Sequence, residues 1–211
     1  MKPEKQERPW VPSLAAIVIL AGFVALILFT QGLNTQAFCY VFLAFILCAI
    51  ALADIERSIV PNRLVLAGLA FWLLSFRFIP LSQFEPGIVS LFFPSVQQGS
   101  LVVFFDSLLS ALFVSGFILL VSVVAEQLSK KPMLGGGDIK LFFMVGLYLG
   151  FWGSVLNLFL SCLLGILVAF LWRRKGKQQQ ELAEGQPGVQ SHTFPFAPAI
   201  ALATMLTIVF F

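Results

Sequence analysis

Charged side chains are scarce in this sequence. Only 11% of its 211 residues are Asp, Glu, Lys or Arg, whereas 59% are hydrophobic. A water-soluble domain carries about 25% charged residues, so the composition excludes an ordinary soluble domain. We expect an integral-membrane protein with little sequence left for any soluble part.

Side chains that commonly bind metals are also few. The chain has one histidine, His192, which lies in a polar stretch and is expected to be solvated. Cys39, Cys48 and Cys162 form no CxxC pair and lie inside apolar runs, so neither a zinc site nor a disulfide framework is predicted. We therefore expect no metal and no cofactor.

Long uncharged apolar runs dominate the sequence instead. A spanning helix needs roughly 20 such residues. Single spans are predicted at 9–33, 37–53, 61–79, 101–125 and 194–211. The first of these follows a basic stretch, but it is too long for a typical signal peptide and no clear A-x-A cleavage site follows it, so we expect a retained span.

Two further segments need separate interpretation. As one helix, residues 141–172 would measure about 48 Å, well beyond a hydrocarbon core of roughly 30 Å, so we predict two spans that turn near 150–153. Residues 80–99 are apolar but are interrupted by proline and glycine, which is typical of an interfacial loop. The predicted fold is thus all-α, a polytopic membrane bundle of about seven transmembrane helices.

The basic residues orient this bundle. With the amino terminus in the cytoplasm, all 13 lysines and arginines except Arg77 lie on the cytoplasmic side, as the positive-inside rule requires. We divide the chain into a tail and first span, 1–36, and a larger membrane domain, 37–211. Residues 173–193 are predicted to form a polar cytoplasmic linker within that domain.

Three aspartates lie within or beside the predicted spans: Asp54, Asp106 and Asp138. Acidic groups in a membrane are costly to desolvate, so each is a candidate functional residue. Asp54 ends the second span and Asp138 begins the fifth, so both carboxylates are expected at the cytoplasmic boundary. Asp106 lies near the outer end of its span, where we expect it to pair with a polar neighbour or face a wet crevice.

Three short motifs occur in order along the chain. Residues 54–62 read Asp-x6-Pro-Asn, residues 135–140 read Gly-Gly-Gly-Asp-Ile-Lys and residues 195–198 read Pro-Phe-Ala-Pro. Alone, the glycine run fits a turn before a helix with Asp138 as its N-cap; it matches no phosphate-binding GxxxxGK[ST] loop. Together, the motifs resemble those of the type IV prepilin peptidases, GxGD-class intramembrane aspartyl proteases with the patterns D-x6-P-[DN], GxGD-[VI]-K and PFGP.

The resemblance implies a catalytic pair, Asp54 and Asp138. It places the following residues in support of the active site or in substrate binding: Pro61, Gly135, Gly137, Lys140, Pro195, Phe196 and Pro198. Lys140 either contacts the acidic side of a substrate or anchors its helix at the headgroups. Because an anion is favoured at a helix amino end and disfavoured at a carboxyl end, we predict Asp138 as the initial base and Asp54 as the acid, although coupled groups can exchange roles.

The same resemblance implies the activity and its partners. It points to an aspartic endopeptidase that cleaves the leader of type IV prepilin or pseudopilin-like precursors, which carry an N-terminal hydrophobic helix, at the cytoplasmic face of a bacterial inner membrane. Bifunctional members carry an insertion with two CxxC pairs that is linked to N-methylation. Nothing in this sequence corresponds to it, so methyltransferase activity is not expected.

One alternative from another functional class is a small ion- or proton-coupled transporter or channel. It predicts all three aspartates along one transmembrane path, whereas a protease predicts Asp54 and Asp138 together and Asp106 apart. Either protein would have the lipid bilayer as its partner and no nucleic acid, and the sequence leaves the oligomeric state open.

Overall fold

The computed structural model describes residues 14–78, 87–92, 99–129, 135–180 and 196–210. Regular structure in these ranges is entirely helical, in the order α1 (Leu14–Gln31), α2 (Thr35–Arg57), α3 (Asn62–Ser75), the 3-10 turn η1 (Phe76–Phe78), α4 (Ile88–Phe92), α5 (Ser100–Ser129), α6 (Gly136–Gln180) and α7 (Ala197–Phe210). The N-terminal tail, His192, Pro195 and the end of the predicted linker lie outside the described residues.

Local signals set the ends of the helices near the motifs. The Asn34 side chain accepts a hydrogen bond from the Ala37 N–H at 2.8 Å and caps α2. At the other end of α2, Ser58 adopts a left-handed conformation with a φ of 51°, and its N–H donates to the Asp54 carbonyl at 2.8 Å. Pro61 then precedes α3 as its N-cap residue. Asp54 therefore lies in the last turn of α2 rather than beyond it.

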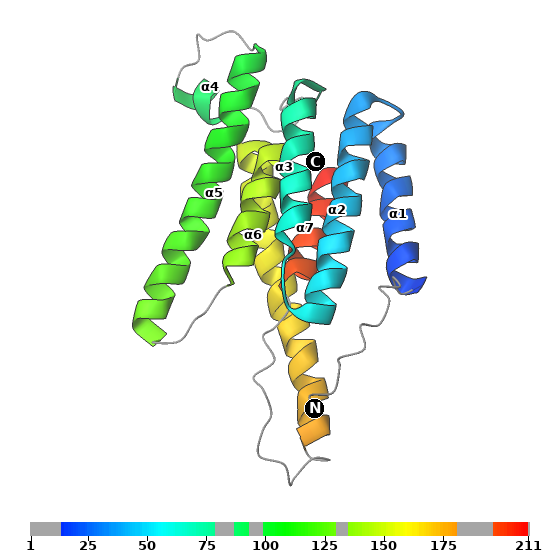
Figure 1. The fold of residues 1–211 in the computed structure, drawn as a ribbon, viewed down its shortest axis with the longest axis vertical. Helices are drawn as coiled ribbons and strands as arrows, with labels where there is room; N and C mark the ends of the chain where they lie inside the picture. Colours follow the sequence, from blue (N-terminus) through cyan, green and yellow to red (C-terminus); the bar gives the residue numbers. More distant parts are fainter. Residues whose placement is uncertain (1–13, 79–86, 93–98, 130–134, 181–195, 211) are drawn as a thin grey trace, which may run out of the picture.

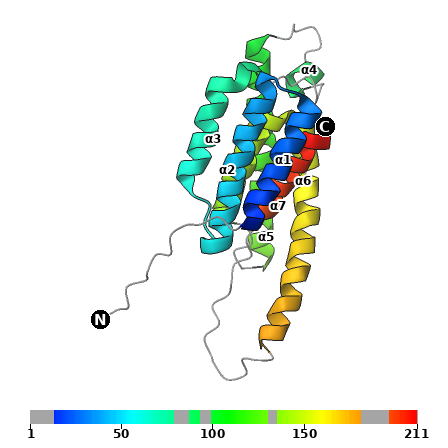
Figure 2. The same ribbon diagram turned by 90° about the vertical axis from the view of Figure 1, so that its right-hand side faces the viewer.

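Helix α6 is two helices joined at Gly150. This residue has a φ of 67° and a ψ of −167°, a conformation essentially restricted to glycine. The two arms, 136–149 and 151–180, run in opposite directions beside each other (Figures 1 and 2). The predicted reversal near 150–153 is confirmed. The second arm continues to Gln180, so the prediction that the linker begins at residue 173 is wrong.

The all-α membrane bundle is confirmed. Three helical segments are long and apolar enough to cross a bilayer: Thr35–Arg57, Ser100–Leu128 and Gly136–Phe170. Two shorter apolar helices, Ala16–Gln31 and Ala197–Phe210, join them. With α3, and with α6 counted as two arms, seven apolar helical passes run through the described part of the bundle.

Close contacts between helices hold the first arm of α6 at the centre of the bundle. Helix α6 packs against α5, α7 and α3, and α2 packs against α7 and α1. A Cβ added at Gly146 would come within 2.8 Å of the Ala111 Cα on α5. On the other side, the Tyr148 hydroxyl donates to the Gly68 carbonyl of α3 at 2.7 Å. Small residues allow this close approach, which replaces the hydrophobic effect as the driving force between helices in lipid.

Asp106 lies near the opposite end of the bundle from the end of α2. Its Oδ1 accepts a hydrogen bond from the Val89 N–H of α4 at 2.6 Å, and Gly87 packs directly against its carboxyl group. This confirms the prediction that Asp106 pairs with a polar neighbour. The described part of residues 80–99 contains only the five-residue helix α4, which is too short to span a bilayer.

Candidate active site

The three motifs meet at one end of the bundle. The end of α2 and the beginnings of α3, α6 and α7 lie together at the lower end of Figure 1, whereas α4 and the start of α5 lie at the upper end. Asp54 belongs to the last turn of α2 and Asp138 to the first turn of α6. The alternation of helix direction therefore brings distant parts of the sequence to one site.

Asp54 is held by the third motif. Its side chain is 6% exposed, and its Oδ2 accepts a hydrogen bond from the Ala197 N–H at 3.0 Å. The N–H groups in the first turn of a helix have no partner within the helix, so Asp54 supplies an acceptor to the start of α7. The sequence analysis missed this backbone donor, although the Pro-Phe-Ala-Pro motif marks its position.

Asp138 interacts with both the glycine motif and Asp54. Its carboxylate accepts a backbone hydrogen bond from Gly135 and interacts electrostatically with the Asp54 carboxylate. An acidic residue near the third helical position commonly reaches back in this way to the N–H that precedes the helix. The two aspartates thus form a pair in which each carboxylate accepts one backbone N–H.

This symmetry removes the basis of the predicted acid and base roles. The prediction placed only Asp138 at a helix amino end. In the structure, Asp138 lies at the amino end of α6 and Asp54 contacts the amino end of α7, so a helix dipole favours an anion at both positions. The dipole argument therefore assigns no fixed base within the pair.

The two glycines expected to support the site differ in their surroundings. Gly135 is exposed, and the nearest atom to a Cβ built on it is the Asp138 Oδ2, at 3.5 Å. A Cβ on Gly137 would instead lie 2.9 Å from the Val60 side chain. Gly137 thus seats the loop between α2 and α3 on the start of α6, while Gly135 leaves open backbone beside the carboxylates.

Lys140 joins α6 to α3. Its Nζ donates a hydrogen bond to the Asn62 Oδ1 at 3.1 Å, and both residues are exposed. Asn62 begins α3 directly after Pro61, so the Pro-Asn part of the first motif meets the Asp-Ile-Lys part of the second. The sequence predicted a role for Lys140 but missed Asn62 as its partner.

Phe196 anchors the beginning of α7. Its ring lies 6.4 Å from the Phe142 ring, measured between centroids, and packs directly on Gly165 of the second arm of α6. Pro198 lies in the first turn of α7, where its missing N–H costs no helical hydrogen bond. These residues position the helix whose first N–H binds Asp54.

The described residues include no group of three or more His, Cys, Asp or Glu side chains that could hold a metal ion. The cysteines are unpaired thiols far from a ligand cluster: Cys39 is buried, Cys48 half-buried and Cys162 exposed. The chemistry available at the described site therefore consists of two carboxyl groups, exposed glycine backbone and one lysine.

Comparison with known proteins identifies the family. The chain is 27% identical over 175 residues to the prepilin leader peptidase/N-methyltransferase of Bacillus subtilis (strain 168), with 83% of this chain and 56% of that relative covered. The chain thus spans just over half the length of this curated relative, and no solved structure matches it. The model of the type IV leader peptidase family matches residues 40–170, more than half of the chain. This confirms the resemblance seen in the three motifs: the chain belongs to the type IV leader peptidase family.

Proposed function

We propose that the chain is a membrane aspartic endopeptidase that cleaves the leader of prepilin-like precursors, with Asp54 and Asp138 as its catalytic pair. The observation that carries the proposal is the electrostatic contact between these carboxylates at the meeting point of the three motifs. The family match supports the same reaction class.

Two neighbouring carboxyl groups share a proton because both cannot ionise cheaply at close range. In the proposed reaction, the ionised carboxylate takes a proton from a water molecule as that water attacks the scissile carbonyl. The protonated partner hydrogen-bonds the carbonyl oxygen and later protonates the leaving amine. The N–H groups of Gly135 and Ala197 hold the two carboxylates in place for these transfers.

The distribution of charge supports a site at the cytoplasmic face. Arg57, Arg63 and Lys140 lie at the end of the bundle that carries the aspartate pair, whereas Arg77 lies at the other end in η1. Basic residues gather on the cytoplasmic side of membrane proteins. A precursor with its leader in the cytoplasm and its apolar helix in the bilayer would present the junction between them at this level.

The transporter alternative receives less support. It requires Asp106 on a path with the other two aspartates, but Asp106 lies near the opposite end of the bundle and binds the Val89 N–H. The described residues offer no acidic group between the two ends.

A direct test uses the purified chain in lipid with a recombinant prepilin-type precursor that has a basic leader and an apolar helix. We expect one cut, between the leader and the helix, seen as a single new mass by mass spectrometry. Asp138→Asn protein, purified in parallel, controls for contaminating proteases. An intact precursor, or a cut at the same rate with the Asp138→Asn control, would contradict the proposal.

A further inference from the structure

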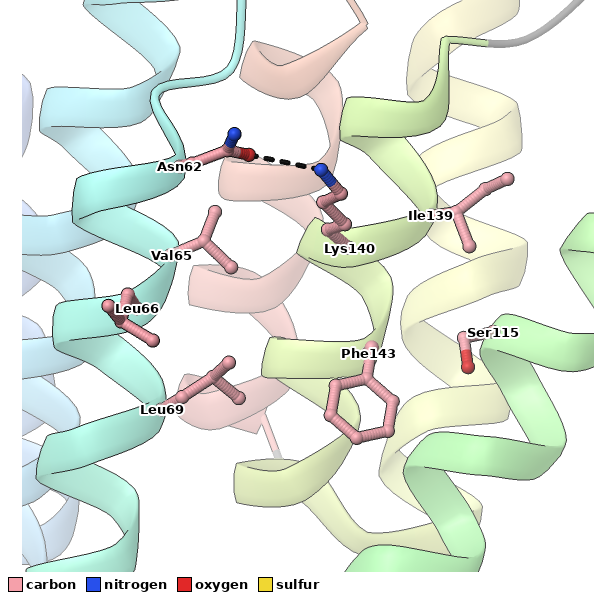
Figure 3. Close-up of a pocket in the computed structure, with 8 residues that line it drawn as sticks. All are labelled: Asn62, Val65, Leu66, Leu69, Ser115, Ile139, Lys140 and Phe143. Carbon is pink, nitrogen blue, oxygen red and sulfur yellow. Dashed lines mark hydrogen bonds between the residues drawn. The ribbon is translucent and has the colours of Figure 1, made fainter.

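An open apolar groove lies beside the aspartate pair (Figure 3). It has a volume of about 380 Å³ and runs between α3 and α5, with the first arm of α6 as its floor. Leu66 and Leu69 of α3 form one wall, Phe143 of α6 lies at the base and Ser115 marks the α5 side. Leu66 is 67% exposed, so this wall faces the lipid.

The two ends of the groove differ. At one end, Lys140 and Asn62 face each other across the opening, and their hydrogen bond uses one of the three ammonium protons. Beyond the other end, α3 and η1 are joined to α5 by aromatic contacts. The Phe104 ring centroid lies 5.4 Å from that of Trp72 and 5.5 Å from that of Phe76. The groove is therefore open toward the bilayer, closed at depth, and polar only at the end near the catalytic pair.

We propose that this groove binds the apolar transmembrane helix of the peptide substrate, with a carboxylate in the first turn of that helix placed at Lys140. The inference rests on the proposed function and adds the docking surface and the feature of the substrate that sets its register. An apolar helix presents a stripe of side chains at i, i+3, i+4 and i+7, which suits a long shallow groove better than a compact ligand does.

The position of the groove favours a helix that continues into the active site. Ile139 and Lys140 line the groove and directly follow Asp138. Two residues on a helix are separated by about 3 Å along its axis, so a few extended substrate residues at about 3.3 Å each reach from the groove to the carboxylates. On the opposite side, α2 and α7 pack on each other and cover Asp54.

Charge complementarity defines the end of the occupant. A helix amino terminus carries a partial positive charge, which Lys140 would repel. A carboxylate in the first helical turn reverses that interaction and accepts the protons that Asn62 leaves free. The other candidate occupant is a phospholipid, with its acyl chain in the groove and its phosphate at Lys140.

Cysteine crosslinking distinguishes these occupants. Leu66→Cys and a control, Leu74→Cys, are made in a chain whose three native cysteines are replaced by serine; Leu74 lies on the same helix, is 80% exposed and does not line the groove. Each is tested with a cleavable precursor that carries single cysteines along its helix. We expect crosslinks to Leu66→Cys that recur every three or four substrate positions, and none to Leu74→Cys. Equal crosslinking of both variants, or a groove crosslinked by photoreactive lipid but not by the precursor, would overturn the docking surface.

Steady-state cleavage provides an independent measurement. Leu66→Trp fills the groove from an exposed position, and we expect its KM to rise about tenfold, equivalent to about 1.4 kcal/mol of binding, with kcat within twofold of Leu74→Trp. Equal KM values for the two variants would exclude the groove while wild-type cleavage continues. A wild-type chain that cleaves no precursor would instead contradict the proposed function itself.

The role of Lys140 is tested by exchanging charges. Lys140→Glu is expected to raise KM for a precursor with glutamate in the first turn of its helix, and a precursor with lysine at that position is expected to restore it. Lys140→Gln, which keeps a hydrogen-bond donor, separates charge from hydrogen bonding. If Lys140→Glu prefers the same precursor as the wild type, Lys140 does not read the charge of the substrate.

Discussion

Asp54 and Asp106 have nearly the same local environment at opposite ends of one bundle. Their side chains are 6% and 5% exposed, and each carboxylate accepts a backbone N–H from the start of another helix. Ala197 of α7 donates to Asp54 at 3.0 Å, and Val89 of α4 donates to Asp106 at 2.6 Å. By burial and hydrogen bonding alone, the two residues would be judged equivalent.

A second acid separates them. The Asp54 carboxylate interacts with that of Asp138, whereas the described neighbours of the Asp106 carboxyl group are Gly87 and the Val89 N–H. A buried aspartate in a membrane bundle can therefore serve only to fasten a helix. The property that marks a candidate catalytic acid here is a neighbouring carboxyl group, because only a pair can share the proton that the reaction needs.

The largest expected effect tests this distinction directly. Asp54→Asn and Asp138→Asn each remove one member of the proton-sharing pair and keep its shape, so cleavage should fall by about 10³-fold or more. The measurement is leader cleavage per folded protein, with membrane insertion checked by size-exclusion chromatography. Asp106→Asn is the matched variant at the other end and should retain activity within about threefold, since an amide oxygen can still accept the Val89 N–H. Equal losses in all three variants would break the comparison.

Glycine substitutions extend the comparison to the backbone around each acid. Gly137→Ala forces a methyl group against Val60 and shifts the α2–α3 loop. Overpacking of this kind costs about 1–3 kcal/mol, and we expect cleavage to fall by about tenfold or more. Gly87→Ala forces a methyl group against Asp106 and should lower the thermal midpoint while sparing kcat. Gly116→Ala, with no atom within 4 Å of its Cβ, controls for substitution itself. A Gly87→Ala chain that is stable but inactive would place the α4 end in the catalytic machinery.

A smaller effect is expected when the Asp106 side chain is truncated. Asp106→Ala leaves the Val89 N–H without its acceptor, and loss of a cap of this type costs about 0.5–2 kcal/mol. Thermal unfolding in detergent should show a midpoint a few degrees lower, with cleavage at permissive temperature unchanged. Ser110→Ala, which removes a hydroxyl that donates to the Asp106 carbonyl, tests whether any polar loss nearby has the same effect. An unchanged midpoint in Asp106→Ala would show that the bond contributes little.

The smallest expected effects concern groups outside the pair. Replacing Cys39, Cys48 and Cys162 together by serine, or adding a chelator, should change cleavage by less than about twofold, because two carboxyl groups activate water unaided. With a methyl donor supplied, mass spectrometry of the cleaved product should show no added methyl group. Loss of cleavage on chelation would indicate a metal site, and a methylated product would contradict the peptidase-only prediction.

The sequence predicted the features that depend on length and charge. A run too long for one span required a reversal, and the structure has it at Gly150. The arrangement of basic loops placed Asp54 and Asp138 at the same end, where the structure brings them into contact. Both inferences follow from how lipid restricts a chain, so they need no knowledge of side-chain packing.

Contacts between distant segments could not be predicted in this way. The bond from Ala197 to Asp54 and the seat of Val60 on Gly137 depend on how helices dock, and no local pattern encodes that. The same omission undermined the predicted acid and base roles. Residues 173–180 were predicted as part of a linker because they are polar, yet arginine, lysine and glutamine are good helix formers and continue α6.

The bond between Ala197 and Asp54 also has a consequence for biosynthesis. Both aspartates belong to helices that leave the ribosome before α7, whereas the donor that holds Asp54 belongs to α7 itself. A nascent chain inserted as far as α6 therefore contains both acids but lacks one of the hydrogen bonds that orient them. Completion of the site is tied to insertion of α7, so the order of synthesis delays full proteolytic competence until the bundle is assembled.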